Sequence, residues 1–236
     1  REVCDSTGRI HDGRYVSEEY AMSFVRYNTD GIILDVDGTL WDSTAEVAIA
    51  WNNAVEMAGL SHEPLTAEGL KGLFGKPMNE IVDALFPDAS EEEKARFRHF
   101  AYEEEGRVLR EGTDDIMYPG VVETMRSFYK EVPFYIVSNC QEGYIECLLD
   151  RFDLRREVYD WECYGKTGLG KAENIKLLVE RNEIKAPVYI GDTDMDRKAC
   201  WEAKVPFIFA KYGFGQIERG SAFFEIDKFA DIMDLF

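Results

Sequence analysis

Short apolar runs alternate with amphipathic segments along most of this chain. The segments between the runs carry apolar residues at helical spacing, as Ile175, Leu178 and Val179 do after Lys171. Strands that alternate with helices predict a parallel sheet with right-handed crossovers, and therefore an α/β fold. The runs that read as strands are 32–34, 132–137, 188–190 and 205–210, with a shorter one expected near 159–164.

The pattern changes directly after the first strand, because residues 43–115 hold no strong strand signal. Asp42-Ser43-Thr44 can cap a helix that ends at Gly59. Three more helices are expected before residue 111: over 66–74, over 78–85 and from residue 90 onward. We therefore predict an all-helical cap inserted into an α/β core. The boundaries are 43–115 for the cap, 29–42 and 116–236 for the core, and 1–28 for an N-terminal extension without an assigned role.

Composition and charge narrow the possible partners. The chain has 236 residues and a formal net charge of −19, which argues against a sequence-independent nucleic-acid binder and against docking on anionic membranes. The five cysteines form no CxxC or Cys/His cluster, and no apolar stretch approaches membrane-spanning length. We expect a cytoplasmic protein with reduced thiols, as a monomer or weak homodimer.

Two carboxylates, Asp35 and Asp37, follow the apolar run Ile32-Ile33-Leu34, and Gly38 and Thr39 close the turn. Ligands in open α/β sheets bind beyond the carboxyl ends of strands, so this pair would lie at the mouth of the sheet. Two anions this close need a cation or a shared proton. On this stretch alone an acidic surface turn fits equally well, because Asp and Gly are favoured in turns.

Two further strands end in polar residues that suit the same site. Ser138 and Asn139 follow the second strand, Asp192 and Asp196 follow the third, and Lys171 opens the helix before the third. Taken singly, Ser138-Asn139 is typical of a helix cap or turn, and the acids from Asp192 to Asp196 are typical of a helix N-terminus. Lys171 alone is typical of a solvated lysine. All of them in this order, at strand ends, are much harder to assign to chance.

Together these residue types indicate metal-dependent phosphoryl transfer. Carboxylates that converge at one sheet edge make an oxygen-rich site that suits Mg²⁺. A carboxylate can attack phosphorus and form an aspartyl-phosphate. A hydroxyl, backbone N–H groups and a lysine can bind the equatorial oxygens in the transition state.

The chain resembles the haloacid dehalogenase superfamily from about residue 30 to residue 215. The helical insert is similar to the cap of the phosphoglycolate phosphatase-like branch, and the resemblance implies a Rossmann-like core with a mobile cap over the active site. Four ordered motifs carry the likeness: Asp35-Val36-Asp37-Gly38-Thr39, Ser138-Asn139, Lys171 and Gly191-Asp192-Thr193-Asp194-Met195-Asp196.

The resemblance implies a role for each matched residue. Asp35 would be the nucleophile and a Mg²⁺ ligand. Asp37 would protonate the leaving oxygen and then activate water, while its backbone carbonyl binds the metal. Ser138 and the backbone of Asn139 would hold the phosphoryl group, and Lys171 would neutralise Asp35 and the phosphate.

The remaining motif positions carry less definite roles. Asp192 would complete the metal site, with Asp196 as a ligand or as outer-shell support, and the role of Asp194 stays open. Thr39 is expected to bind substrate and to hydrogen-bond around Asp37. Lys76 could contact an anionic leaving group from the cap loop, although a solvated loop lysine is at least as good an interpretation.

Asp37 also separates reaction classes. Dehalogenases that resemble this fold lack an aspartate there, because a halide leaves without a proton, whereas an alkoxide needs one. We therefore predict a Mg²⁺-dependent phosphatase acting on a small phosphorylated metabolite: a phosphoglycolate-like ester, a sugar phosphate or a nucleotide. A phosphomutase, a pyrophosphatase and a catalytically silent phospho-ligand-binding relative stay open. Trp41 and Trp51 are expected to be packing residues.

Overall fold

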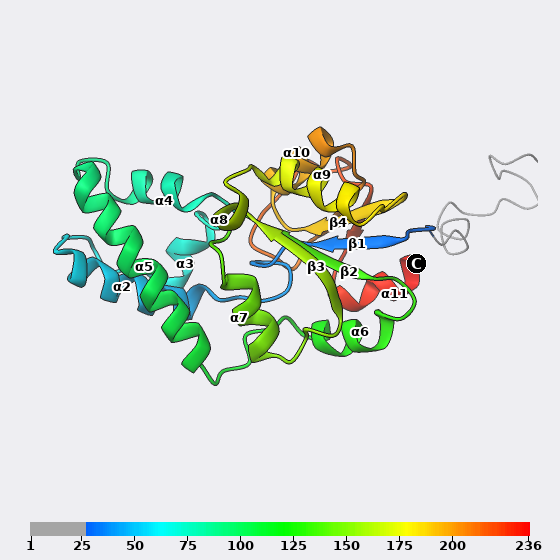
Figure 1. Ribbon diagram of the computed structural model, residues 1–236, viewed down its shortest axis with the longest axis horizontal. Helices are drawn as coiled ribbons and strands as arrows, with labels where there is room; N and C mark the ends of the chain where they lie inside the picture. Colours follow the sequence, from blue (N-terminus) through cyan, green and yellow to red (C-terminus); the bar gives the residue numbers. More distant parts are fainter. Residues whose placement is uncertain (1–26) are drawn as a thin grey trace, which may run out of the picture.

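A six-stranded parallel sheet forms the centre of the larger unit in the computed structural model, which describes residues 27–236 (Figure 1). The strand order is β3-β2-β1-β4-β5-β6, and every neighbouring pair is parallel. The predicted α/β fold with a Rossmann-like sheet is therefore confirmed. The N-terminal extension expected over 1–28 lies outside the described residues, except for residues 27 and 28. The strands are β1 (Gly31–Leu34), β2 (Phe134–Ser138), β3 (Val158–Cys163), β4 (Pro187–Gly191), β5 (Phe207–Ala210) and β6 (Phe224–Ile226).

Helices cover both faces of the sheet. Helices α9 and α10 lie on one face, and α6, α7 and α11 lie on the other (Figure 1). The side chains of β1 explain the two layers: Ile32 and Leu34 pack on the α6/α7 side and Ile33 packs on the α9/α10 side. The helical elements of this unit are α6 (Val121–Phe128), α7 (Tyr144–Arg151), α8 (Tyr164–Thr167), α9 (Lys171–Arg181), α10 (Asp194–Ala203), the 3₁₀ turn η1 (Phe229–Asp231) and α11 (Ile232–Leu235).

The strand β1 is the middle of the functional edge. It is fully buried and hydrogen-bonds to β2 on one side and β4 on the other. Such a strand reads as a continuous apolar run because both of its faces are covered. The chain leaves β1 at Asp35, so this carboxylate lies at the carboxyl edge between the ends of β2 and β4.

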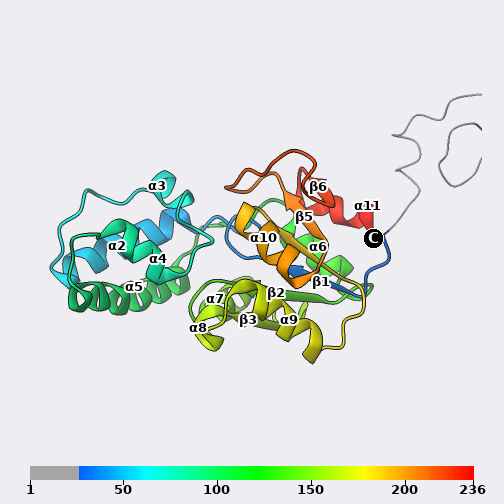
Figure 2. The ribbon, with the colours of Figure 1, turned by 90° about the horizontal axis from the view of Figure 1, so that it is seen from above.

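Four helices form a second unit beside the sheet (Figures 1 and 2). Helices α2 and α5 lie side by side, and the unit has its own apolar core, which includes Trp51, Leu70, Val82 and Phe97. The bounds are α2 (Thr44–Ala58), α3 (Ala67–Lys71), α4 (Met78–Leu85) and α5 (Glu91–Glu111). None of the helices within residues 27–236 combines the length and apolar character needed to cross a membrane.

The chain enters and leaves this helical unit through two adjacent connections. The Asp42 N–H donates to the Ile116 carbonyl at 2.8 Å, and the Tyr118 N–H donates to the Leu40 carbonyl at 2.9 Å. Beside them, the Arg151 guanidinium donates to both carboxylate oxygens of Glu46, at 2.6 and 2.9 Å. Both side chains of this ion pair are buried, so a bidentate charged contact joins α7 of the core to α2 of the helical unit.

Several elements differ from the sequence prediction. The strands predicted over 132–137 and 205–210 begin two residues later, at Phe134 and Phe207, and the short helical elements α8, η1 and α11 were not predicted. The helix predicted over 66–74 is only α3, because the chain turns at Gly72 after a single short helix. The strand β6 was missed altogether. It has three residues with one of them buried, so its sequence lacks the continuous apolar run of the inner strands.

The first prediction tests the central strand. Leu34→Ala should lower the free energy of unfolding by about 2–5 kcal/mol, because it opens a cavity between two parallel neighbours. The matched control is Ile49→Ala in α2, where the side chain is 57% exposed, and its effect should stay within about 0.5 kcal/mol. Urea denaturation followed by tryptophan fluorescence measures both. Equal losses in the two variants would contradict this packing.

Candidate active site

A cavity lies where the carboxyl edge of the sheet meets the helical unit. Residues from both units line it. Asp35, Asp37, Ser138 and Asn139 come from the sheet edge, and Lys76 comes from the loop between α3 and α4. The structure therefore brings five of the predicted site residues to one cavity.

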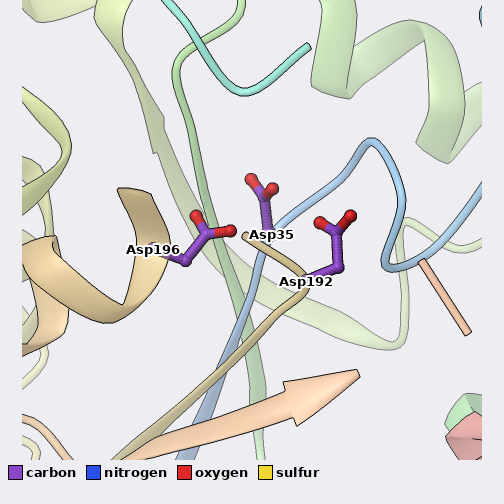
Figure 3. A group of neighbouring side chains, drawn as sticks. All are labelled: Asp35, Asp192 and Asp196. Atoms are coloured by element: carbon purple, nitrogen blue, oxygen red, sulfur yellow. The ribbon is translucent and has the colours of Figure 1, made fainter. Parts of the chain in front are cut away.

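Three buried carboxylates form a cluster at this edge (Figure 3). Asp35 follows β1, Asp192 follows β4, and Asp196 lies in the first turn of α10. One carboxylate oxygen from each lies within 4.8 Å of the others. Oxygen ligands at this spacing are typical of a hard divalent cation. The side chain of Asp37 lies outside this cluster.

Lys171 lies against the cluster. Its Nζ donates to Asp35 Oδ1 at 2.8 Å and to Asp196 Oδ1 at 2.5 Å. Burial alone would lower the pKa of Lys171, but the two carboxylates outweigh it and raise the pKa overall. With three ionised carboxylates and one ammonium, the cluster keeps two net negative charges in a buried place. A divalent cation would offset that charge.

The pKa values of the carboxyl groups are raised in this cluster, as its excess of buried negative charge predicts. Burial raises the pKa of Asp35 to about 7; Lys171 opposes this shift and Asp196 adds to it. Burial also raises the pKa of Asp192 well above its ordinary value, with further contributions from Asp196 and Asp35. These acids resist ionisation next to one another, and a bound cation would restore their charged form. The donor set therefore fits a metal ion.

Local backbone structure holds the two later aspartates in place. Asp196 Oδ2 accepts hydrogen bonds from the N–H and the hydroxyl of Thr193, at 3.0 and 2.6 Å, which forms a capping box at the start of α10. Asp192 Oδ2 accepts from the Phe214 N–H at 2.7 Å. Gly38 has φ +81°, and a Cβ there would lie 2.2 Å from Asp192 Oδ2. The glycine of the first motif thus makes room for the carboxylate of the last.

Asp37 is held by three donors on a single oxygen. Its Oδ1 accepts from Trp41 Nε1 at 2.8 Å, from Ser43 Oγ at 2.8 Å and from the Tyr144 hydroxyl at 2.7 Å. Removal from water raises the pKa of Asp37, although these hydrogen bonds lower it in part. Trp41 is buried as expected, but it is more than a packing residue, because its indole N–H orients this carboxylate.

The structure corrects the expected contact of Thr39 and gives Asp194, whose role was left open, a place on the surface of α10. The hydroxyl of Thr39 donates to Asp192 Oδ1 at 3.4 Å, in place of the expected contact around Asp37. Thr39 is also fully buried and is not among the residues that line the cavity. Asp194, whose role was open, is partly exposed and pairs with Arg197 at 2.7 Å and with Lys198 at 2.8 Å. It therefore forms ion pairs within the first turns of α10, on the surface of the helix.

Asn139 connects the sheet edge to the helical unit. Its Nδ2 donates to the Gly75 carbonyl at 2.7 Å, which ties the end of β2 to the loop that carries Lys76. The neighbouring Ser138 is buried at the last position of β2 and lines the cavity. Phe74 and Phe214 add a second link between the units, with ring centroids 5.9 Å apart.

Sequence reasoning missed part of the cavity wall. Glu105 of α5 is buried and lines the cavity, and it accepts hydrogen bonds from Trp51 and Gln141. Trp51 is therefore a hydrogen-bond donor as well as a packing residue. The indole N–H of a buried tryptophan usually has a hydrogen-bond acceptor, so Trp51 was the one feature of the sequence that indicated a polar group in this wall. The acceptor itself could not be identified, because Glu105 is 54 residues away along the chain.

Comparison with known proteins gives one family. The model of the haloacid dehalogenase-like hydrolases matches residues 32–210. A phosphoglycolate phosphatase of Photobacterium profundum is 27% identical over 222 residues, which cover 86% of this chain and 94% of that protein. A phosphoglycolate phosphatase of Aquifex aeolicus is 24% identical over 211 residues and covers 86% and 95%.

Solved structures share the fold. A predicted phosphoglycolate phosphatase of Haemophilus somnus superposes with a TM-score of 0.76 at 20% identity, over 87% of this chain and 97% of that one. CbbY of Rhodobacter sphaeroides, solved in complex with xylulose bisphosphate, gives 0.72 at 17% identity, over 86% and 96%. These likenesses show the fold alone. The family match over residues 32–210 shows more: the chain belongs to the haloacid dehalogenase-like hydrolases, and the prediction of a phosphatase enzyme is confirmed at that level.

Proposed function

We propose that this phosphatase is Mg²⁺-dependent and hydrolyses a small phosphomonoester through an aspartyl-phosphate on Asp35. The observation that carries the proposal is the pairing of Asp35 with Lys171 inside the buried acidic cluster, next to a cavity that also holds Asp37. This arrangement supports the proposal, because the groups that would serve as nucleophile, proton carrier and cation ligands lie together. The names of the relatives and the ligand of CbbY support a small phosphorylated substrate.

The metal would be held by Asp35, Asp192 and the backbone carbonyl of Asp37. Both oxygens of Asp196 already accept hydrogen bonds, from Lys171 and from Thr193, so Asp196 acts mainly by holding its neighbours. When bound, Mg²⁺ supplies positive charge that allows a phosphate dianion to approach this acidic edge. Lys171 supplies the remaining charge compensation at Asp35.

The first half-reaction uses Asp35 and Asp37. Lys171 holds Asp35 by Oδ1, which leaves Oδ2 for attack on phosphorus. The new P–O bond forms as the ester P–O bond breaks, and the departing oxygen takes a proton from Asp37. The three donors on Asp37 Oδ1 orient its carboxyl group so that Oδ2 carries that proton. The raised pKa of Asp37 favours its protonated form before transfer.

The second half-reaction reverses the proton transfer. Asp37, now ionised, takes a proton from water as the water oxygen attacks phosphorus, and the bond to Asp35 breaks to release inorganic phosphate. The Ser138 hydroxyl and the backbone N–H of Asn139 bind phosphoryl oxygens in both steps. Both residues line the cavity, so they can reach the group throughout.

The helical unit would act as the cap over this reaction. The hydrogen bond from Asn139 to Gly75 and the contact between Phe74 and Phe214 join its loop to the core. Such closure limits water around the reacting phosphorus. The two adjacent connections at residues 42 and 116 provide the pivot on which the cap would open for substrate.

One prediction tests the nucleophile. Asp35→Asn should reduce Mg²⁺-dependent phosphate release from a panel of small phosphate esters by about 10³-fold or more, because an amide does not attack phosphorus. Asp194→Asn is the matched control and should keep nearly full activity, since Asp194 pairs only with surface cations on α10. Near-normal turnover by the Asp35 variant would disprove the assigned nucleophile. Substrate isomers that form faster than phosphate would indicate a phosphomutase.

A second prediction tests the metal site by stability. At a Mg²⁺ concentration 100 times its dissociation constant, the wild-type protein should gain about 2.7 kcal/mol of unfolding free energy. Asp192→Asn should lose this gain, yet in chelator it should be at least as stable as wild type, because it removes a buried charge with a raised pKa. Thermal unfolding with Mg²⁺ and with EDTA measures both effects. An equal Mg²⁺ shift in the two proteins would place the ion elsewhere.

A further inference from the structure

The cavity contains a carboxylate that the proposed chemistry does not use. Glu105 belongs to α5 of the helical unit, is only 3% exposed, and lines the same cavity as Asp35 and Asp37. Its Oε2 accepts from Trp51 Nε1 at 2.7 Å, and its Oε1 accepts from Gln141 Nε2 at 2.6 Å. These donors are neutral. No ion pair involving Glu105 occurs within residues 27–236.

A carboxylate in this position is costly unless it has a use. Burial raises the pKa of Glu105 to about 7, and the charge of Asp37 adds to the shift. A glutamine could accept from Trp51 with its carbonyl oxygen, and Gln141 could turn its own amide to accept from the glutamine NH₂. The two hydrogen bonds therefore do not by themselves require an acid at this position. The surrounding wall is otherwise largely apolar, with Val47, Met78 and Ile81. Glu105 is thus the acidic group of the cap side of the cavity.

We propose that Glu105 selects the leaving group, by accepting a hydrogen bond from a hydroxyl or ammonium group on the departing alcohol. This inference rests on the proposed phosphatase function and specifies its substrate class. A carboxylate offers about four acceptor positions, of which Trp51 and Gln141 use two. The remaining lone pairs are available to a ligand in the cavity. Glu105 is therefore a specificity-determining residue.

The same charge disfavours a carboxylate on the leaving group. Within residues 27–236, three acids line the cavity, Asp35, Asp37 and Glu105, and one lysine does, Lys76. The ammonium of Lys171 is already engaged by Asp35 and Asp196. A second anion beside Glu105 would be repelled in a site with little water to screen it. Phosphoglycolate, the substrate in the names of several relatives, should therefore be a poor substrate here.

Glu105 also lies at the boundary between the two units, which defines the rival explanation. Trp51 belongs to the cap side, whereas Gln141 follows β2 in the core. A carboxylate that merely holds the cap closed would affect every substrate equally. A specificity residue changes the ratio between substrates that differ only in their terminal group. The test must therefore compare ratios of kcat/KM.

The test uses three esters of similar size, 2-hydroxyethyl phosphate, 2-aminoethyl phosphate and phosphoglycolate, with Mg²⁺ at pH 8. The wild-type protein should prefer the donor-bearing esters to phosphoglycolate by about tenfold or more in kcat/KM, since a hydrogen bond to a charged group is worth at least this factor. Glu105→Met should remove most of the preference. Glu105→Gln keeps an acceptor oxygen, so it should retain the hydroxyl ester better than the ammonium ester.

The two variants distinguish the sources of the donor. A larger loss on the ammonium ester in the glutamine variant would identify a cationic leaving group, and a loss confined to the methionine variant would identify a neutral hydroxyl. Glu104→Gln is the matched control on α5, because Glu104 bonds to Arg107 and Asn53, outside the cavity lining. It should leave all three ratios unchanged.

Several outcomes would overturn the proposal. A wild-type preference for phosphoglycolate would do so, as would an equal fall in kcat/KM on all three esters in both Glu105 variants, which would leave only cap closure. If the protein hydrolyses an activated aryl phosphate but none of the three esters, the leaving-group assignment is refuted and the phosphatase function is not. Folded protein that releases phosphate from no ester, the aryl one included, would instead refute the phosphatase function on which it rests.

Discussion

The contact on which the site depends is the buried ammonium of Lys171 between Asp35 and Asp196. It lets one segment from β1 and one from the β4–α10 turn place carboxylates side by side at the centre of the sheet. The compensation is incomplete, because Asp192 adds a further acid to the same cluster. The protein thus maintains a local charge imbalance, and the chemistry we propose uses it to bind a cation and then a phosphate.

Other parts of the core hold the acidic side chains of this cluster in position. The capping box at Thr193 gives Asp196 a rigid position, and the Phe214 N–H does the same for Asp192. Gly38 adopts a left-handed backbone conformation at a position where a side chain would collide with Asp192, so the turn after Asp37 and the turn after β4 are fitted to each other. The contacts of Gly38 and Thr39 with Asp192 join the first motif to the last, although these residues are more than 150 positions apart along the chain.

Most of the core site could be predicted from the sequence because its residues stand at strand ends. Asp35, Ser138 and Asp192 each follow an apolar run, and a parallel sheet brings such ends to one edge. The partners of these residues could not be predicted in the same way. Thr39 reaches Asp192, and Tyr144 reaches Asp37, through side-chain directions that depend on the finished packing. The strand β6 was missed because it is too short and too polar to give a periodic signal.

The cap side of the cavity was the least predictable part, and it is where we propose that specificity arises. The fold is shared with other members of the family, so it does not by itself separate one phosphomonoester from another. Glu105 lies in the middle of a helix whose pattern of charges is typical of a solvated surface, and nothing in that pattern marks one of three consecutive glutamates as buried. Its role becomes visible only when α5 packs against Trp51 and the loop after β2. A substrate that donates a hydrogen bond to Glu105 would gain affinity only when the cap is closed. Closure of the cap and selection of the substrate would then depend on the same contact.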